Sequence, residues 1–99
     1  MHCLTVTYPA PSDAARFKAY YETKHVPLAK QLPGLKSCAF AYPEALGPDT
    51  APFCIFQAWF DNAATMLAAL QSDIGRKVAA DVSNYSPDGA TIFHYATGA

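Results

Sequence analysis

Phe53 to Phe60 reads F-C-I-F-Q-A-W-F and is apolar at every position except Gln57. Alternate residues of a strand point to opposite faces of the sheet. One face of this segment therefore receives Phe53, Ile55, Gln57 and Trp59, and the other receives Cys54, Phe56, Ala58 and Phe60. Helices can cover only one of these faces, and an exposed apolar patch normally marks a contact with another subunit. We therefore expect an obligate homodimer with two sheets packed face to face.

The segments around this strand predict a βαββαβ order. Leu35 to Tyr42 is a second strand, joined to Phe53 to Phe60 as a hairpin through the loop Pro43 to Pro52. Upstream, Cys3 to Tyr8 alternates as a strand does, and a helix capped by Ser12 or Asp13 runs to about His25. Downstream we expect a helix from Asp61 or Asn62 to about Leu70, a short helix from Ser72 or Asp73 to about Asp81, and a strand over Thr91 to Tyr95.

This order is typical of the split βαβ, ferredoxin-like α+β fold, an antiparallel four-stranded sheet with helices on one face. No repeat or linker interrupts the chain, so residues 1–99 are expected to form a single domain. Pro27 removes the amide that would bond the carbonyl of Thr23, and it disfavours helical geometry at Val26. We therefore expect the first helix to kink or end beside His25.

The composition narrows the classes of function. Charged residues make up only 15% of the chain, the net charge is -1, and the basic residues form no continuous run, so neither nucleic acid nor a membrane is an expected partner. No apolar stretch is long enough to span a bilayer, and we expect a cytoplasmic protein. The cysteines Cys3, Cys38 and Cys54 are widely spaced within apolar runs, which favours buried thiols over a metal site.

Two further segments carry a family resemblance. Phe17 to Leu35 reads F-K-A-Y-Y-E-T-K-H-V-P-L-A-K-Q-L-P-G-L, and Ser72 to Tyr85 reads S-D-I-G-R-K-V-A-A-D-V-S-N-Y. With these motifs in this order the chain resembles the EthD family, small proteins associated with degradation of ethyl tert-butyl ether. The resemblance covers nearly the whole chain and implies a dimeric α/β barrel. That superfamily also holds cofactor-free monooxygenases and haem-degrading enzymes, and some fungal relatives look like dehydratases, so the fold alone fixes no chemistry.

His25 is the first candidate for a catalytic residue, because an imidazole can give or take a proton near neutral pH. The structural alternative is a histidine that caps the carbonyls of a kinked helix end. Asp81 could orient His25, or it could hold the end of its own helix. Tyr21 is the tyrosine we expect to donate a hydrogen bond to a substrate oxygen. Residues expected to line an apolar substrate pocket are Tyr8, Phe56, Trp59 and Phe93.

The function we expect is the binding or conversion of a small hydrophobic oxygenated metabolite in a catabolic pathway, either ether or aromatic degradation. If the protein is an enzyme, it is a cofactor-independent oxidoreductase of the monooxygenase type, or a lyase or dehydratase. No cofactor is expected. A non-catalytic binding or accessory protein that supports an oxygenase system is one alternative, and a haem-binding or haem-degrading barrel is another.

Overall fold

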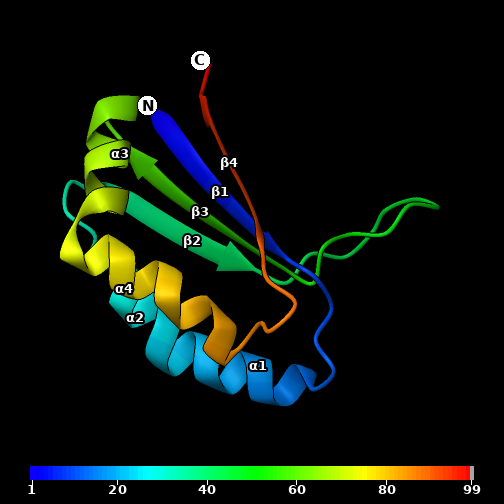
Figure 1. The fold of residues 1–99 in the computed structure, drawn as a ribbon. Coiled ribbons are helices and arrows are strands. Elements are labelled where there is room, and N and C mark those ends of the chain that lie inside the picture. The colour runs from blue at the N-terminus through cyan, green and yellow to red at the C-terminus, as the bar shows by residue number, and fades with distance from the viewer. Residues whose placement is uncertain (99) are drawn as a thin grey trace.

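Four antiparallel strands form a single sheet in the computed structural model, which describes residues 1–98 (Figure 1). The strands are β1 (His2–Tyr8), β2 (Ser37–Ala41), β3 (Cys54–Phe60) and β4 (Thr91–Ala96). Their spatial order is β2-β3-β1-β4, so β1 and β3 are central and β2 and β4 are the edges. The βαββαβ order and the ferredoxin-like α+β fold predicted from the sequence are confirmed.

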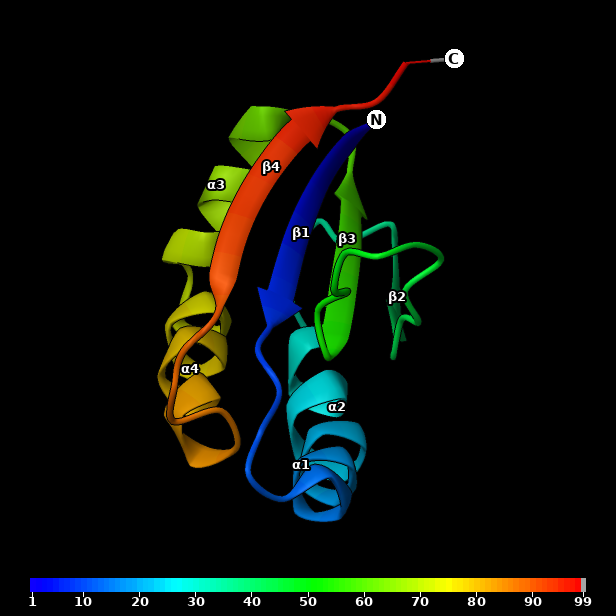
Figure 2. The ribbon, with the colours of Figure 1, turned by 90° about the vertical axis from the view of Figure 1, so that its right-hand side faces the viewer.

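The helices lie on one side of this sheet (Figures 1 and 2). The first helical region consists of α1 (Ala14–Tyr20), a π-helical turn η1 (Tyr21–His25) and α2 (Val26–Ala29). The second consists of α3 (Ala63–Gln71), α4 (Asp73–Asp81) and a short 3-10 turn η2 (Val82–Asn84). Within residues 1–98, none of these helices is long and apolar enough to cross a membrane.

Side-chain caps fix where three of the helices begin. Asp13 accepts a hydrogen bond from the amide of Arg16 at 3.0 Å, and Asn62 accepts one from the amide of Thr65 at 2.9 Å. The hydroxyl of Ser72 accepts one from the amide of Gly75 at 3.1 Å. Each cap satisfies an amide that has no partner inside its own helix. All three caps are among the residues that the sequence predicted for these positions.

The first helical region differs from the expectation at Pro27. The helix neither ends nor breaks beside His25, because the amide of Val26 bonds the carbonyl of Tyr21 and forms a π-helical turn over Tyr21–His25. Pro27 then occupies the first turn of α2, where its missing amide costs little. This wider helical turn directs the side chains of Tyr21 and His25 toward the protein interior, where both are buried. Single π-helical turns of this kind are frequent at functional sites.

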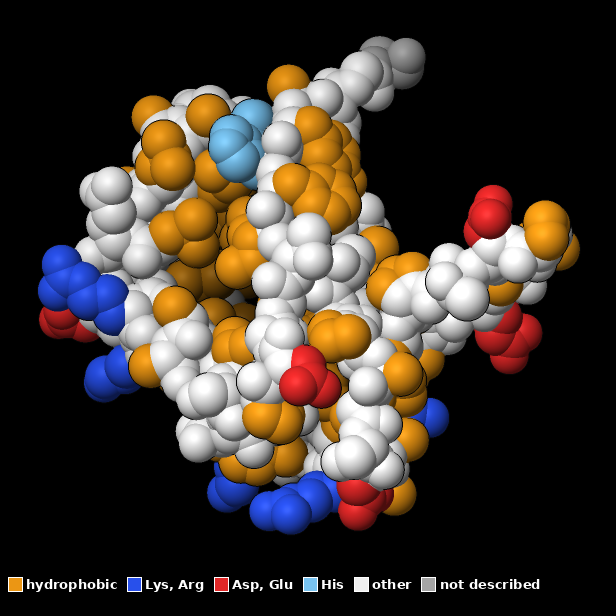
Figure 3. All heavy atoms as spheres, turned by 45° about the vertical axis from the view of Figure 1, so that its right-hand side comes forward, with side chains coloured by type: hydrophobic (Ala, Val, Ile, Leu, Met, Phe, Trp, Pro, Cys, Tyr) orange, Lys and Arg blue, Asp and Glu red, His pale blue; other side chains and the backbone are white. Residues whose placement is uncertain are grey.

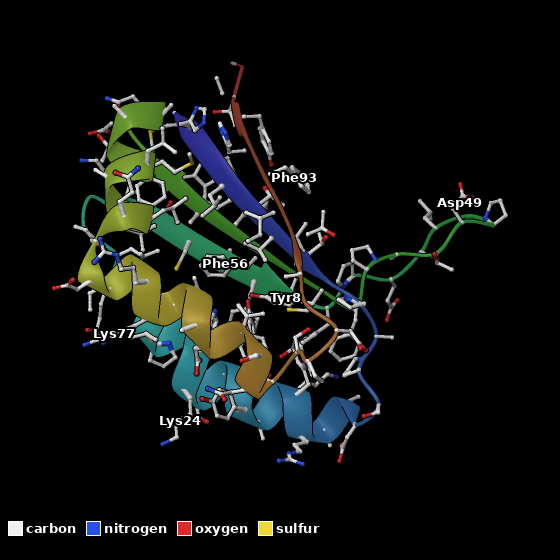
Figure 4. The ribbon with its side chains drawn as sticks, in the orientation of Figure 1. Tyr8, Lys24, Asp49, Phe56, Lys77 and Phe93 are labelled. Atoms are coloured by element: carbon white, nitrogen blue, oxygen red, sulfur yellow. The ribbon has the colours of Figure 1, made fainter. Side chains whose placement is uncertain are left out.

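The two faces of the sheet have different neighbours. Leu4, Val6, Tyr8 and the even-numbered residues of β3 form the core with the helices, and Figure 4 shows Tyr8 and Phe56 pointing toward them. Trp59 pairs with Cys3 and Ser37 on the other side, which no helix of residues 1–98 covers. We call this side the helix-free face. Phe53 was expected there but packs edge-on against Phe17 at 5.0 Å, because it precedes β3 and escapes the strand alternation.

The loop from Pro43 to Pro52 leaves the body of the molecule. It joins β2 to β3 and extends away from the sheet on the side opposite the helices (Figure 1). Residues 44–50 are all exposed. In Figure 3 the loop stands out as an isolated projection with an apolar group near its tip. We call residues 43–52 the arm.

Candidate functional site

A histidine and an aspartate meet between the two helical regions. His25 comes from the π-helical turn η1 and Asp81 from the last residue of α4, and His25 Nδ1 lies 3.0 Å from Asp81 Oδ2. The imidazole is only 3% exposed. Because η1 turns His25 toward the interior and α4 packs against α2, residues 56 positions apart in the chain become direct partners. The sequence predicted both residues, and the structure brings them together.

Two further side chains hold the Asp81 carboxylate in place. The hydroxyl of Tyr20 donates to Asp81 Oδ1 at 2.6 Å, and the amide nitrogen of Asn84 donates to the same oxygen at 2.9 Å. Burial raises the pKa of Asp81, but the hydrogen bonds from Tyr20, Asn84 and His25 outweigh it and leave the pKa below its ordinary value. The carboxylate is therefore ionised at neutral pH, and both of its oxygens are engaged.

The ionised carboxylate determines the state of the imidazole. Burial lowers the pKa of His25, and the hydrogen bond and charge of Asp81 only partly oppose this effect. His25 is therefore neutral at pH 7. Since Asp81 accepts at Nδ1, that nitrogen carries the hydrogen and Nε2 is the nitrogen able to accept a proton. This arrangement of a neutral imidazole oriented by a carboxylate is what a general base requires.

Two tyrosines, Tyr21 and Tyr85, contact the imidazole, and a third, Tyr8, packs against both of them. Tyr21 stacks on His25 with ring centroids 5.5 Å apart, and the ring of Tyr85 lies 4.6 Å from it. The hydroxyls of Tyr8 and Tyr85 are 2.8 Å apart and share a hydrogen bond. Burial raises the pKa of Tyr8 to about 12 and raises the pKa values of Tyr21 and Tyr85 as well. All three phenols are therefore protonated at neutral pH and can act as hydrogen-bond donors.

The hydroxyl of Tyr21 stands apart from the others. Tyr21 is 0% exposed, and its hydroxyl has no hydrogen-bond partner among residues 1–98. Its polar neighbours are the Tyr8 phenol and the Cys54 thiol, whose pKa burial raises to about 11. A buried hydroxyl without a partner costs about 1–3 kcal/mol. Such a group is a candidate donor to a ligand oxygen, which is the role that the sequence predicted for Tyr21.

A groove of about 810 Å³ lies outside this cluster, between α1, η1 and the segment from Ser83 to Asp88. Tyr20, Asn84 and Tyr85 line it, and these residues also contact the His25–Asp81 pair from within. The groove floor is thus one side chain away from the imidazole.

The predicted pocket residues fall into two groups. Tyr8 and Phe56 lie on the helix side of the sheet and belong to the same buried cluster as Tyr21. Trp59 lies on the opposite face, where it pairs with Cys3. Phe93 points from the same face (Figure 4), and its side chain is 45% exposed. The structure does not bring them to His25, because the strand alternation places odd and even positions on different sides.

Sequence reasoning did not single out Tyr85 as a site residue. It follows Asp81 by four positions, at the end of the segment Ser72 to Tyr85 that carries the family resemblance, and that spacing was the available signal. Metal ligation finds no support within residues 1–98, where no three His, Cys, Asp or Glu side chains are grouped closely enough to hold an ion.

Comparisons with known proteins agree with the sequence motifs. The EthD domain matches residues 10–88. An uncharacterised 11.0 kDa protein of the thcB-thcC intergenic region of Rhodococcus erythropolis is 34% identical over 93 residues, which cover 93% of this chain and 90% of that protein. An ethyl tert-butyl ether degradation (EthD) family protein from Bacillus halodurans superposes with a TM-score of 0.90 at 20% identity, over 99% of both chains.

Two more distant solved structures share the fold. A dimeric ferredoxin-like protein of unknown function from Thermobifida fusca has a TM-score of 0.71 at 14% identity, covering 97% of this chain and 89% of that one. SnoaB, a cofactor-independent oxygenase from Streptomyces nogalater, has a TM-score of 0.69 at 10% identity, covering 97% of this chain and 91% of that one. At these identities the likeness concerns the fold alone.

Proposed function

This chain belongs to the EthD family, and from that premise we propose that it binds or converts a small hydrophobic oxygenated metabolite of a catabolic pathway, in ether or aromatic degradation. His25 accepts the proton in this proposal, Asp81 orients the imidazole, and Tyr21 donates a hydrogen bond to the oxygen of the ligand. The observation that carries the proposal is the buried pair of His25 Nδ1 and Asp81 Oδ2, 3.0 Å apart, beside a buried hydroxyl without a partner.

Proton transfer is the step that these residues can perform. Neutral His25 accepts a proton on Nε2 from a carbon or oxygen of the ligand, and the imidazolium that forms is stabilised by the Asp81 carboxylate. The Tyr21 hydroxyl stabilises the negative charge that develops on the ligand oxygen. The same step begins a lyase or dehydratase reaction and a cofactor-independent oxidation of the monooxygenase type. The cofactor-independent oxygenase from Streptomyces nogalater shares this fold.

We also propose that the protein works as a homodimer through the helix-free face. Trp59 lies on this face, and Phe93 and Tyr95 are 45% and 37% exposed on it. Large aromatic side chains are enriched at subunit interfaces, where they become buried. The fold neighbour from Thermobifida fusca is described as dimeric, which supports the proposal.

A non-catalytic binding or accessory role is the alternative that one observation favours. His25 is only 3% exposed and does not itself line the groove. A ligand could therefore occupy the groove beside Tyr20 and Tyr85 without reaching the imidazole. In that case the His25–Asp81 pair would serve to tie η1 to α4.

Exchange of carbon-bound hydrogen for deuterium tests the catalytic proposal without knowledge of the natural substrate. Acetophenone is a small hydrophobic ketone whose methyl protons exchange by base catalysis, and the exchange in D₂O can be followed by NMR. The native protein should accelerate it, and His25→Gln should lose about 10²-fold or more of that acceleration. His94→Gln, which changes an exposed histidine on β4, is the matched control and should exchange like the native protein.

The outcome also separates the two proposals. Equal acceleration by the native protein and His25→Gln would refute the role of His25 as the base. Line broadening or shifts of acetophenone signals in the absence of accelerated exchange would instead support the binding or accessory role.

A further inference from the structure

The arm is an unusual element for a chain of this size. Its ten residues, Pro43 to Pro52, form neither strand nor helix, and they make a longer connection than the roughly 2–5 residues usual in a β-hairpin loop. Near its tip Leu46 is 104% exposed, the highest exposure among the large hydrophobic residues. Figure 4 shows Asp49 far from the body of the molecule, at the end of this projection. A single exposed apolar side chain is common on protein surfaces, but Leu46 lies in a projection whose residues 44–50 are all exposed.

The total solvent-accessible surface is also larger than that of an average compact chain. The chain exposes 6019 Å², whereas a compact monomer of its mass, 10.6 kDa, is expected to expose about 5,500 Å². A projection that packs on nothing adds surface of this order. Pro43, Pro48 and Pro52 restrict the backbone of the arm, so holding it extended costs less conformational entropy than it would in a Gly-rich loop.

The direction in which the arm extends indicates which molecule it would contact. It leaves the sheet between β2 and β3 and extends on the side of the helix-free face, away from all helices (Figures 1 and 2). A second protomer that covers Trp59, Phe93 and Tyr95 must lie on this same side. The arm would then stand beside the body of that protomer, continuous with the interface formed by the two sheets.

We propose that the arm is a clasp between protomers, and that residues 43–52 of each chain pack along the partner with Leu46 buried against it. The proposal rests on the homodimer proposed above and adds a second contact region to it. Two-fold symmetry places one arm at each side of the paired sheets, so each dimer buries Leu46 twice. The interface would then consist of the two packed sheets and, at each side of them, one arm in contact with the partner.

Photo-crosslinking tests where the arm lies in the native dimer. A benzophenone amino acid in place of Leu46 should give, on irradiation of the purified protein, a covalent species of twice the 10.6 kDa chain mass. The matched control has the same replacement at Leu67, which is 47% exposed on α3 on the helix side. That control should stay at the mass of one chain. Absence of the covalent dimer at position 46, in a protein that is dimeric by native mass measurement, would overturn the clasp.

Dissociation of the dimer gives a second, independent readout. Leu46→Ser should raise the dissociation constant of the dimer by roughly tenfold or more for each of the two leucines. Leu67→Ser should leave it unchanged. If the native protein is dimeric and Leu46→Ser dissociates no more readily, the clasp is refuted while the sheet interface stands. If the native protein is monomeric at micromolar concentration, the homodimer and the clasp both fail.

Discussion

Replacing Tyr21 with phenylalanine should stabilise the protein and weaken its function at the same time. The ring of Tyr21 is 0% exposed and stacks on Phe17 and His25 with centroids 5.3 and 5.5 Å away, and phenylalanine keeps these contacts. The change removes only the hydroxyl, which has no hydrogen-bond partner among residues 1–98. Since a buried hydroxyl without a partner costs about 1–3 kcal/mol, the free energy of unfolding should rise by about 1 kcal/mol in Tyr21→Phe.

A matched variant makes the sign of this effect decisive. The Tyr8 hydroxyl shares a 2.8 Å hydrogen bond with the hydroxyl of Tyr85, so Tyr8→Phe leaves a buried group without its partner. Tyr8→Phe should therefore lower the free energy of unfolding by about 1–3 kcal/mol. The two substitutions remove the same atom from buried tyrosines of one cluster and are expected to have opposite effects.

Urea denaturation at one fixed protomer concentration measures both variants, because the stability of a dimer depends on concentration. In thermal unfolding, a rise of about 1 kcal/mol corresponds to roughly 4–8 °C for a domain of this size. Destabilisation of Tyr21→Phe by as much as Tyr8→Phe would refute the reasoning, since the Tyr21 hydroxyl would then have a hydrogen-bond partner, such as the Cys54 thiol. The same variant should bind acetophenone more weakly if the hydroxyl donates to the ligand.

Three other predictions concern the His25–Asp81 pair and the helix packing. Folding lowers the pKa of His25, so the stabilisation that comes from its neutral form is present above pH 6.5 and is lost as the pH falls below that value. Folding also lowers the pKa of Asp81, so the stabilisation that comes from its ionised form is lost only below about pH 3.8. Chemical denaturation should therefore show a free energy of unfolding that declines from pH 7 to pH 5, and a smaller decline in His25→Gln. Tyr20→Phe removes a hydrogen bond that lowers the pKa of Asp81, so that pKa should rise in a carboxyl-carbon NMR titration; Tyr42→Phe, whose hydroxyl donates to Glu22, should leave it unchanged. Gly75→Ala should lower the free energy of unfolding by about 1–3 kcal/mol, because its Cβ would clash with the carbonyl oxygens of Ala69 and Leu70, whereas Gly98→Ala, with nothing within 4 Å, should have almost no effect.

Local sequence rules predicted most of the fold. The alternation of β1 and β3, and the caps Asn62 and Ser72, depend on side chains a few residues apart, and the structure confirms them. The same local rules could not predict the π-helical turn. Pro27 shows only that one hydrogen bond is missing, and whether the helix ends or widens depends on the buried packing of Tyr21 and His25. Tertiary contacts decided between these outcomes.

The sequence predicted the central residues of the candidate site but not the full set of side chains that surround them. The pairing of Asp81 with His25 was one of two alternatives that the sequence left open, because it required the helix that carries Asp81 to approach the first helix. The positions of Trp59 and Phe93 depend on which face of the sheet the helices cover, and a strand that is apolar on both sides does not reveal that. The structure adds that Tyr20 and Asn84 donate hydrogen bonds to one carboxylate oxygen of Asp81, at 2.6 and 2.9 Å.

The central position of β1 determines when the sheet can be completed during synthesis. Its partner β4 is far along the chain, and the hydrogen bond between the Thr5 and Tyr95 hydroxyl groups joins residues 90 positions apart. β1 leaves the ribosome before β4 and cannot form its second ladder until β4 has been synthesised. Contacts of such long range make folding slow and leave an apolar strand unpaired in the nascent chain. We expect production of this protein to depend on chaperones more strongly than its small size suggests.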